Sequence, residues 1–432
     1  MIDVTHSGPT FSSDTIHCPA CQTLITYYDV ANSSYYGCSD CHAFFQYENE
    51  GPPQLIRQFS QTEYVSSLPI GTDGYLHGQF VRVVGFMHKR EQNPLYQWAE
   101  YILLQQDGKT SQLAEYNGHW VWITPTTDTY RPYHHAGNVY YVDTAARQYR
   151  LYNRYQPQVL GAVGEFDWNI MDDEHLSVSE YINPPHMLVS EERNNLSSWY
   201  KGSHLSPAEV ATAFGLSEAV LPVPEGIGAV QPADPKNRLS TVLPFTSIAL
   251  VALVAIQIIF TITKPAKQVF DQSFNVVSDS THSFKPIVTP TFEVDGPAAL
   301  GFNFRAYIDN DWLELPVTLI EEQSGRTYDF TKTLEYYHGY EGGESWSEGS
   351  PSDDAILSRI PSGRYHLTIY PANNAGQNIS FSISVKQNPM LGANVGLMLV
   401  LFMIYPVFLY CHNQWYESRR WSNSDFVNTS TE

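Results

Sequence analysis

The chain has 432 residues and is strongly acidic, with 24 Lys and Arg against 45 Asp and Glu and a formal net charge of −21. Nucleic-acid binding rests on basic patches that neutralise phosphates, and the longest basic run here is the His-Lys-Arg at residues 88–90. The composition therefore argues against a nucleic-acid partner.

Four of the five cysteines form two CxxC motifs near the start of the chain, separated by 16 residues: Cys18 with Cys21, and Cys38 with Cys41. Each CxxC turn can supply two thiolates to one tetrahedral ion, so the spacing predicts a zinc ribbon over residues 15–46. Four thiolates leave no open coordination position, so we expect a structural Zn²⁺ that folds the module. We expect Gly37 to serve the second tight turn. Two disulfides or a redox dithiol are the alternatives.

Residues 64–216 predict a mainly β domain. Apolar and polar residues alternate in stretches such as 78–87 and 117–125, and Asn-Gly or Asp-Gly turns separate them, which is typical of antiparallel strands. One helix has clear end signals, since Ser206 and Glu209 form a capping box and a proline and a glycine stand at its two ends. We expect a β-barrel-like domain.

An internal similarity links residues 78–104 with residues 147–182. Each segment has a short strand, an aromatic-Xaa-Trp step and a later Glu-Tyr pair, which is Glu100-Tyr101 in the first and Glu180-Tyr181 in the second. An internal duplication, giving a pseudo-symmetric barrel, is one interpretation. Chance overlap between aromatic strands is the other.

Over about residues 15–215 the sequence resembles a bacterial family known as domain of unknown function 4178. The resemblance rests on a paired-cysteine ribbon followed by Gly71, Gly85, Trp98, Glu100, Tyr101, Trp120, Gly164, Trp168, Tyr181, Pro184 and Pro185. It implies no known catalytic residues. Members are typically encoded beside phage-shock-type membrane-remodelling proteins and polyamine aminopropyltransferases. The resemblance therefore implies a link to membrane stress or polyamine biology, and a phage-shock-type membrane protein as a partner.

An enzyme in the β domain is not indicated by any motif, since HExxH, GxSxG and phosphate-binding glycine loops are absent from it. Its polar candidates are His134, His135, Glu100, Asp167, Asp172, Asp173, Glu174 and His175. We expect the histidine pair in a loop and residues 172–176 in a solvated turn. Glu100 and Glu180 stand beside aromatic strands, and an enzyme would need them to converge.

Two charge-free apolar stretches predict transmembrane helices, at residues 242–263 and 390–411. Each has 22 residues, and a helix needs about 20 to cross the hydrocarbon core. A buried core helix is the alternative. Residues 217–241 contain several Pro and Gly residues and predict a flexible linker before the first span.

The charges beside the spans give the orientation only weakly. Arg419 and Arg420 follow the second span, and Lys236 and Arg238 precede the first, but three lysines on the other side oppose them. The zinc-type cysteines fit a reducing cytosol, and no cysteine lies between the spans. We therefore expect a two-pass protein of the bacterial inner membrane, with the ribbon, the β domain, the tail (residues 412–432) and both termini in the cytoplasm.

Residues 264–389 between the spans predict an extracytoplasmic β-sandwich. Residues 335–354 stand apart within it, and Gly339, Gly342 and Gly343 predict a loop. This loop carries candidate ligand-binding residues: Tyr336, Tyr337, Tyr340, Glu341, Glu344 and Trp346. Aromatic rings with carboxylates can hold a sugar, a polyamine or another cation such as Ca²⁺. An acidic hairpin tip is the alternative.

The sequence as a whole favours a non-enzymatic, membrane-anchored scaffold or sensor. We expect its cytoplasmic part to recruit a protein partner, and a homo-oligomer is compatible with the sequence. The alternative is a hydrolase-type enzyme with its active site in the cytoplasmic β domain.

Overall fold

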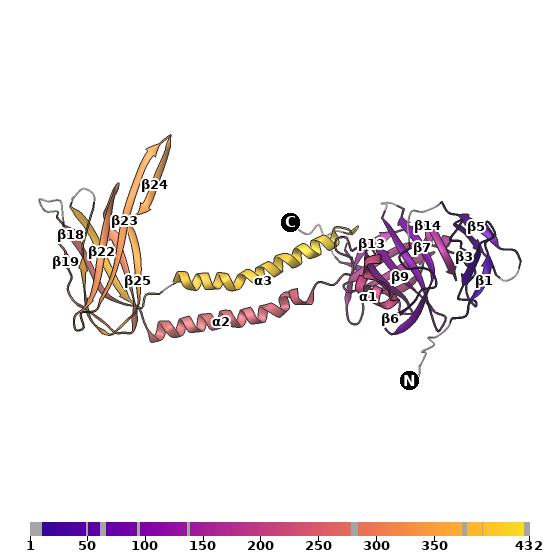
Figure 1. Cartoon of the computed structure of the whole chain (residues 1–432), viewed down its shortest axis with the longest axis horizontal. Helices are drawn as coiled ribbons and strands as arrows, with labels where there is room; N and C mark the ends of the chain where they lie inside the picture. Colours follow the sequence, from indigo (N-terminus) through magenta and orange to yellow (C-terminus); the bar gives the residue numbers. More distant parts are fainter. Residues whose placement is uncertain are drawn as a thin grey trace, which may run out of the picture. The chain divides into compact units, whose positions relative to one another are not determined.

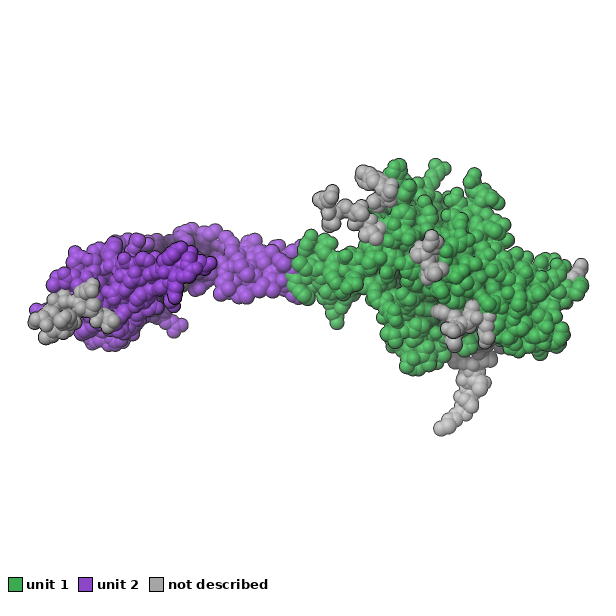
Figure 2. All heavy atoms as spheres, turned by 90° about the horizontal axis from the view of Figure 1, so that it is seen from above, with its two compact units in different colours: residues 1–238, 408–432 green, residues 239–407 purple. Residues whose placement is uncertain are grey.

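A computed structural model describes residues 11–48, 51–60, 66–92, 96–135, 139–277, 284–373, 378–390 and 392–426. The chain divides into two compact units, coloured separately in Figure 2. Unit 1 comprises residues 1–238 and 408–432, and unit 2 comprises residues 239–407. The end of the chain thus returns to the unit in which the chain begins.

Unit 1 is built mainly from strands. They are β1 (Asp14–His17), β2 (Leu24–Tyr27), β3 (Tyr35–Gly37), β4 (Ala43–Gln46), β5 (Gln54–Gln58), β6 (Asp73–Leu76), β7 (Gln79–Glu91), β8 (Gln97–Gln105), β9 (Thr110–Tyr116), β10 (His119–Thr126), β11 (Tyr133–His135), β12 (Val139–Asp143), β13 (Gln148–Tyr155), β14 (Pro157–Phe166), β15 (Ser177–Asn183), β16 (His186–Arg193) and β17 (Leu196–Leu205). The helical segments are η1 (Ile170–His175), α1 (Pro207–Phe214), η2 (Glu218–Val220) and η3 (Pro235–Asn237).

Fifteen of these strands form one sheet, in the order β11-β12-β13-β15-β16-β17-β10-β9-β8-β7-β14-β3-β4-β5, with β6 on β7. Strand β13 passes through Gln156 directly into β14, although the two stand far apart in the strand order. The sheet therefore curls back on itself between them. No ladder joins β13 to β14 among the described strands, so the expectation of a barrel is wrong and the sheet is open.

The cysteine ribbon is continuous with this sheet. Strand β3 pairs with β14, and Gly37 lies opposite Gly164. A Cβ on Gly37 would lie 2.4 Å from the Ala162 carbonyl oxygen, so this glycine allows two strands to approach closely and does not form the tight turn we expected of it. The buried Glu165 carboxylate accepts hydrogen bonds from the backbone N–H groups of Tyr28 (2.7 Å) and Asp29 (3.0 Å), which fixes the ribbon to the sheet.

Helix α1 confirms the capping box. Glu209 N–H donates to the Ser206 hydroxyl, the Ser206 N–H donates to the Glu209 carboxylate, and Gly215 ends the helix with φ of 64°. Val210 and Phe214 are buried on the helix face that packs on the sheet.

The segment after α1 is not a loose tether over its whole length. Leu221 and Val230 are buried, and the Glu225 N–H donates to the Asn117 carbonyl (2.9 Å). A Cβ on Gly228 would lie 2.7 Å from the His119 ring. The first half of the predicted linker is thus packed on unit 1: Leu221 and Val230 join two of its buried clusters, and the segment between them contacts the β9–β10 turn.

Unit 2 contains α2 (Leu239–Thr263) and two sheets (Figure 1). Its strands are β18 (Lys267–Val276), β19 (Ile287–Val288), β20 (Phe292–Val294), β21 (Ala298–Ala306), β22 (Asp311–Glu321), β23 (Thr327–Glu341), β24 (Glu344–Ser350), β25 (Ser352–Ile360), β26 (Gly363–Ile369) and β27 (Ile379–Gln387). One sheet has the order β18-β27-β21-β25 and the other β19-β26-β22-β23-β24, with β20 on β26. Buried side chains of both sheets, such as Phe304 and Leu315, form one core.

Helices α2 and α3 (Gly392–Trp421) are long and apolar enough to cross a membrane, with mean hydropathies of 2.4 and 2.0 over their most apolar stretches. Their apolar side chains, including Ile259 and Val400, are largely exposed within the described chain. This exposure does not fit the alternative of a buried core helix. Helix α3 extends beyond the predicted span by ten residues, up to the arginines that follow it.

Candidate functional site

The four cysteines come together at one point of the ribbon. Their Sγ atoms all lie within 4.8 Å of one another, with 3.6 Å between Cys18 and Cys41 and between Cys21 and Cys38. Zn–S bonds of about 2.3 Å in a tetrahedron place the sulfurs about 3.8 Å apart. All four are free thiols. The arrangement could therefore hold one metal ion and does not form the disulfides of the alternative.

The backbone repeats the same turn at both CxxC motifs. Gln22 and His42, which follow the motifs, have φ of 65° and 59°. Their N–H groups donate to the carbonyls of Cys18 (2.9 Å) and Cys38 (3.1 Å). Two matching turns point four sulfurs at one centre, and this internal symmetry is typical of a structural metal site.

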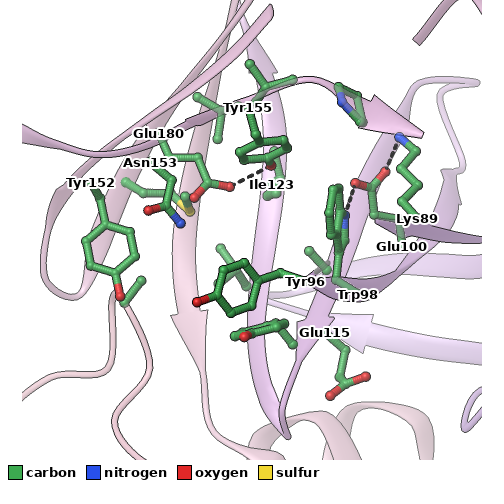
Figure 3. Close-up of a pocket in the computed structure, with 18 of the residues that line it drawn as sticks. Lys89, Tyr96, Trp98, Glu100, Glu115, Ile123, Tyr152, Asn153, Tyr155 and Glu180 are labelled. Atoms are coloured by element: carbon green, nitrogen blue, oxygen red, sulfur yellow. Dashed lines mark hydrogen bonds and ion pairs between the residues drawn. The ribbon is translucent and has the colours of Figure 1, made fainter. Parts of the chain in front are cut away.

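The second candidate site is a cavity of about 160 Å³ inside the curl of the large sheet. Strands β7 to β10 and β13 to β17 all contribute to its wall. Its lining carries one lysine and seven carboxylates: Lys89, Glu91, Glu100, Glu115, Asp173, Glu180, Glu191 and Glu225. An enzyme in this domain would need Glu100 and Glu180 to converge. Both side chains line this cavity, on opposite sides of the Tyr155 ring (Figure 3).

Lys89 organises one side of the cavity. Its ammonium group lies 2.7 Å from a Glu100 oxygen and 2.9 Å from an Asp173 oxygen. The indole N–H groups of Trp98 (2.7 Å) and Trp168 (3.0 Å) donate to the other oxygens of these two carboxylates. Each charge in the group has a partner, so the group is buried without an isolated ion.

The other carboxylates of the cavity are less well compensated. Burial raises the pKa of Glu91 to about 7, and the nearby charges of Asp425 and Glu180 add to the effect. Burial likewise raises the pKa of Glu180 to about 7, although the Tyr155 hydroxyl donates a hydrogen bond to it (2.9 Å). Burial raises the pKa of Glu191 to about 7 against the opposing effect of Lys89. These groups titrate near neutral pH.

Two segments next to the long apolar helices α2 and α3 meet at the rim of the cavity. Gly228 and Ala229 precede α2, Asn423 follows α3, and all three line the cavity. The Arg420 side chain, only 1% exposed, donates to the carbonyls of Gly228 (2.9 Å), Ala229 (2.8 Å) and Gln231 (2.6 Å). It thereby fastens the end of α3 to the segment before α2.

The tail beyond Arg420 continues along β13. The Tyr152 hydroxyl donates to the Arg420 carbonyl (2.8 Å), and the Asp425 N–H donates to the Asn153 side chain (3.0 Å). The Trp421 ring lies under the Arg150 guanidinium, 4.0 Å from its central carbon. Tyr152 and Asn153 are themselves cavity residues, so the tail is in direct contact with the cavity wall.

The remaining polar candidates fall elsewhere. Asp167 and Asp172 line a neighbouring hollow that shares Asp173 and Glu191 with the cavity. Glu174 pairs with Arg57 at 2.9 Å. His134 lies on β11, not in a loop, and the side chain of His135 lies outside the described residues. Residues 170–175 form the short helix η1 with Asp173 buried, so the expectation of a solvated turn there is wrong.

Residues 335–354 form strands of a hairpin, as the alternative interpretation predicts, and not the expected loop. Strand β23 pairs with β24 from Glu335–Ser350 to Glu341–Glu344, around a Gly342-Gly343 turn with positive φ at both residues. Tyr340 is 75% exposed, whereas Trp346 packs over Gly339. The other candidate residues, Tyr336, Tyr337, Glu341 and Glu344, lie along the same hairpin. In the described chain only the cysteines gather as a group of three or more metal-type ligands. A ligand on this hairpin stays a prediction.

Comparison with known proteins supports the family resemblance. Residues 69–207 match the family model described as Domain of unknown function (DUF4178). The match covers the strands that form the cavity and stops before helix α2. The search of curated proteins gave no match.

Among solved structures, the infectious bursal disease virus Gx strain is 10% identical over 87% of this chain and 70% of that chain, with a TM-score of 0.18. The VP2 subviral particle of the same virus is 12% identical over 88% and 70%, also with a TM-score of 0.18. A TM-score this low supports no statement about fold or function.

The raised pKa of Glu180 predicts a pH-dependent stability. A carboxyl whose pKa rises from about 4.5 to about 7 on folding stabilises the fold while neutral, and this contribution is lost as pH rises through 7. The loss begins near the unfolded pKa of about 4.5, so we expect Glu180→Gln to match the wild type at pH 4 and to be more stable at pH 8, by up to about 3 kcal/mol. Thermal unfolding of the full chain in detergent at both pH values measures this.

The matched control is Glu192→Gln, which changes an exposed carboxylate on β16. It should leave the pH dependence unchanged. If Glu180→Gln loses stability with pH as steeply as the wild type, Glu180 is not buried as the structure places it.

Proposed function

We propose that this protein is a two-span sensor of the bacterial inner membrane that reads a small molecule in its cytoplasmic cavity. One observation supports it above the others: the segments that lead into α2 and out of α3 both line the cavity, and Arg420 joins them. A ligand that changes the cavity wall therefore acts on the ends of both membrane helices. A cytoplasmic partner can respond to the same change, and we propose a phage-shock-type membrane protein as that partner.

The cytoplasmic side of the sensor comprises unit 1, and the sandwich of unit 2 faces outward in this proposal. The cysteine site holds a structural Zn²⁺, and the ribbon that it folds extends the cavity-bearing sheet through β3. An exposed, metal-stabilised edge next to the sensing domain suits a docking surface for the protein partner. The role of the domain in membrane stress or polyamine pathways is part of the same proposal.

A second candidate is an acid–base enzyme acting on a small molecule. The convergence of Glu100 and Glu180 on one cavity favours it, since a carboxyl with a pKa near 7 can transfer protons at neutral pH. The residues that line the cavity in the described chain include no Ser, Thr or Cys, so a hydrolase with one of these three nucleophiles does not fit the cavity. Consumption of a metabolite from a cell extract by the wild type but not by Glu180→Gln would establish the enzyme.

The orientation of the sensor can be tested by cysteine labelling. Ser347 is exposed on the β24 strand and Ser217 is exposed after α1, so a cysteine added at either position reports on its side when its labelling is compared with that of the Cys411→Ser parent, which keeps the four ribbon cysteines. We expect an impermeant maleimide to label Ser347→Cys in intact cells and Ser217→Cys only after permeabilisation. Labelling of Ser217→Cys in intact cells would reverse the proposed orientation.

The metal assignment predicts one zinc ion per chain. Metal analysis of the full chain, purified in reducing buffer, should give this stoichiometry for the wild type. Cys38→Ser removes a buried ligand and should lose the metal, whereas Cys411→Ser, which lies on helix α3 away from the cysteine group, should retain it. A wild-type chain with less than a tenth of an equivalent of zinc would contradict the assignment.

A further inference from the structure

The cavity carries more negative charge than its own residues compensate. Of its seven carboxylates, Glu100 and Asp173 share Lys89, which is the one lysine of the lining. No Lys or Arg forms an ion pair with Glu91, Glu180 or Glu191 in the part of the chain that the structure describes. Isolated buried carboxylates are unfavourable unless a proton or another cation accompanies them.

Of these three glutamates, Glu91 gives the clearest evidence of a missing counterion. The residue is 5% exposed and lines the cavity, and its carboxylate has no hydrogen-bond or ion-pair partner among the described residues. Glu180 faces the same space and receives one hydrogen bond, from Tyr155. The charge of Glu180 adds to the effect of burial on the pKa of Glu91, while Glu100 and Asp425 add to the effect of burial on the pKa of Glu180. Two carboxyls near each other thus lack a counterion on the same side of the cavity.

The rest of the wall suits an organic cation. The Trp98 and Tyr155 rings meet edge to face at 5.2 Å, and Tyr96 lies beside them (Figure 3). Cations are attracted to the faces of such rings, while Val178 and Val189 offer hydrocarbon. A cavity of about 150 Å³ can hold benzene, so the space here fits about six non-hydrogen atoms.

We propose that the cavity binds a small aliphatic primary amine, with Glu91 and Glu180 as the counterions of its ammonium group. The alkyl chain lies against Trp98 and Tyr155, and a second ammonium group, where present, faces Glu191. A metal cation fits less well, because these carboxylates do not gather closely enough to share one ion within the described chain. The inference names the ligand class of the proposed sensor and therefore rests on that function.

Binding of an ammonium group requires ionised carboxylates, and those of the empty cavity are partly protonated near neutral pH. Amine binding should therefore release protons from the protein. Affinity should rise between pH 6 and pH 8, below the range in which the amine itself loses its proton.

Titration calorimetry of the zinc-loaded full chain in detergent tests the proposal, with 1,4-diaminobutane and butylamine as probes and 1,4-butanediol as the neutral control. We expect both amines to bind at least tenfold more tightly than the diol, with proton release detected by comparing two buffers. Glu91→Gln and Glu180→Gln should each weaken amine binding at least tenfold. Glu192→Gln, on the exposed side of β16, should bind as the wild type does.

Equal binding of amines and diol, or amine binding insensitive to both cavity variants, would overturn the proposal. Thermal unfolding of each variant shows whether it is folded, so a lost affinity can be assigned to the site. A different small molecule that co-purifies with the wild type and is lost from a cavity-filling Ala114→Phe variant would refute the amine and leave the sensor intact. Absence of any cavity ligand would refute both.

Discussion

The burial of excess negative charge in the curl of the large sheet is the constraint on which this account is built. Carboxylates lose hydration when they enter a protein, and the loss is compensated only by protons, cations or hydrogen-bond donors. On one side of the cavity Lys89 and two indole N–H groups provide that compensation. On the side of Glu91 and Glu180 the described chain provides little. Such a site suits the cationic ligand that we propose.

A second feature of the structure concerns the ends of the long apolar helices α2 and α3. A guanidinium that is buried and bonded to three backbone carbonyls is strongly localised, because each charge-assisted bond contributes about 1.5–3 kcal/mol and no water replaces it. Arg420 therefore holds the end of α3 and the start of the segment before α2 in one place. The tail then follows β13, whose side chains form the cavity wall. The cavity wall, the tail, the end of α3 and the segment before α2 are thus in continuous contact within unit 1.

Much of this organisation could be predicted from local sequence rules, and the reasons for the failures are physical. The CxxC spacing, the capping box at Ser206 and the two long apolar helices depend on neighbours in the sequence, and the structure bears these out as geometry. The sequence shows Lys89 only as part of a basic run. Alternation along a strand predicts that the Lys89 side chain shares a face with Glu91, but it does not predict that this face is concave. The concave shape depends on the pairing of β7 with β14 and on the return of the chain through β13, and both involve contacts between residues far apart in the sequence. Residues 335–354 resemble a loop in sequence because β24 is exposed at every residue and so carries no alternation of apolar and polar residues, while Gly342 and Gly343 form the turn of the hairpin.

The central claim is that filling the cavity changes the two segments that adjoin helices α2 and α3. Hydrogen exchange of the full chain in lipid nanodiscs, with and without a saturating amine, measures this directly at residues 225–231 and 419–426. The account predicts slower exchange in both segments when the cavity is filled, and loss of that slowing in Arg420→Ala. Slower exchange confined to the cavity strands, with both segments unchanged, would contradict it.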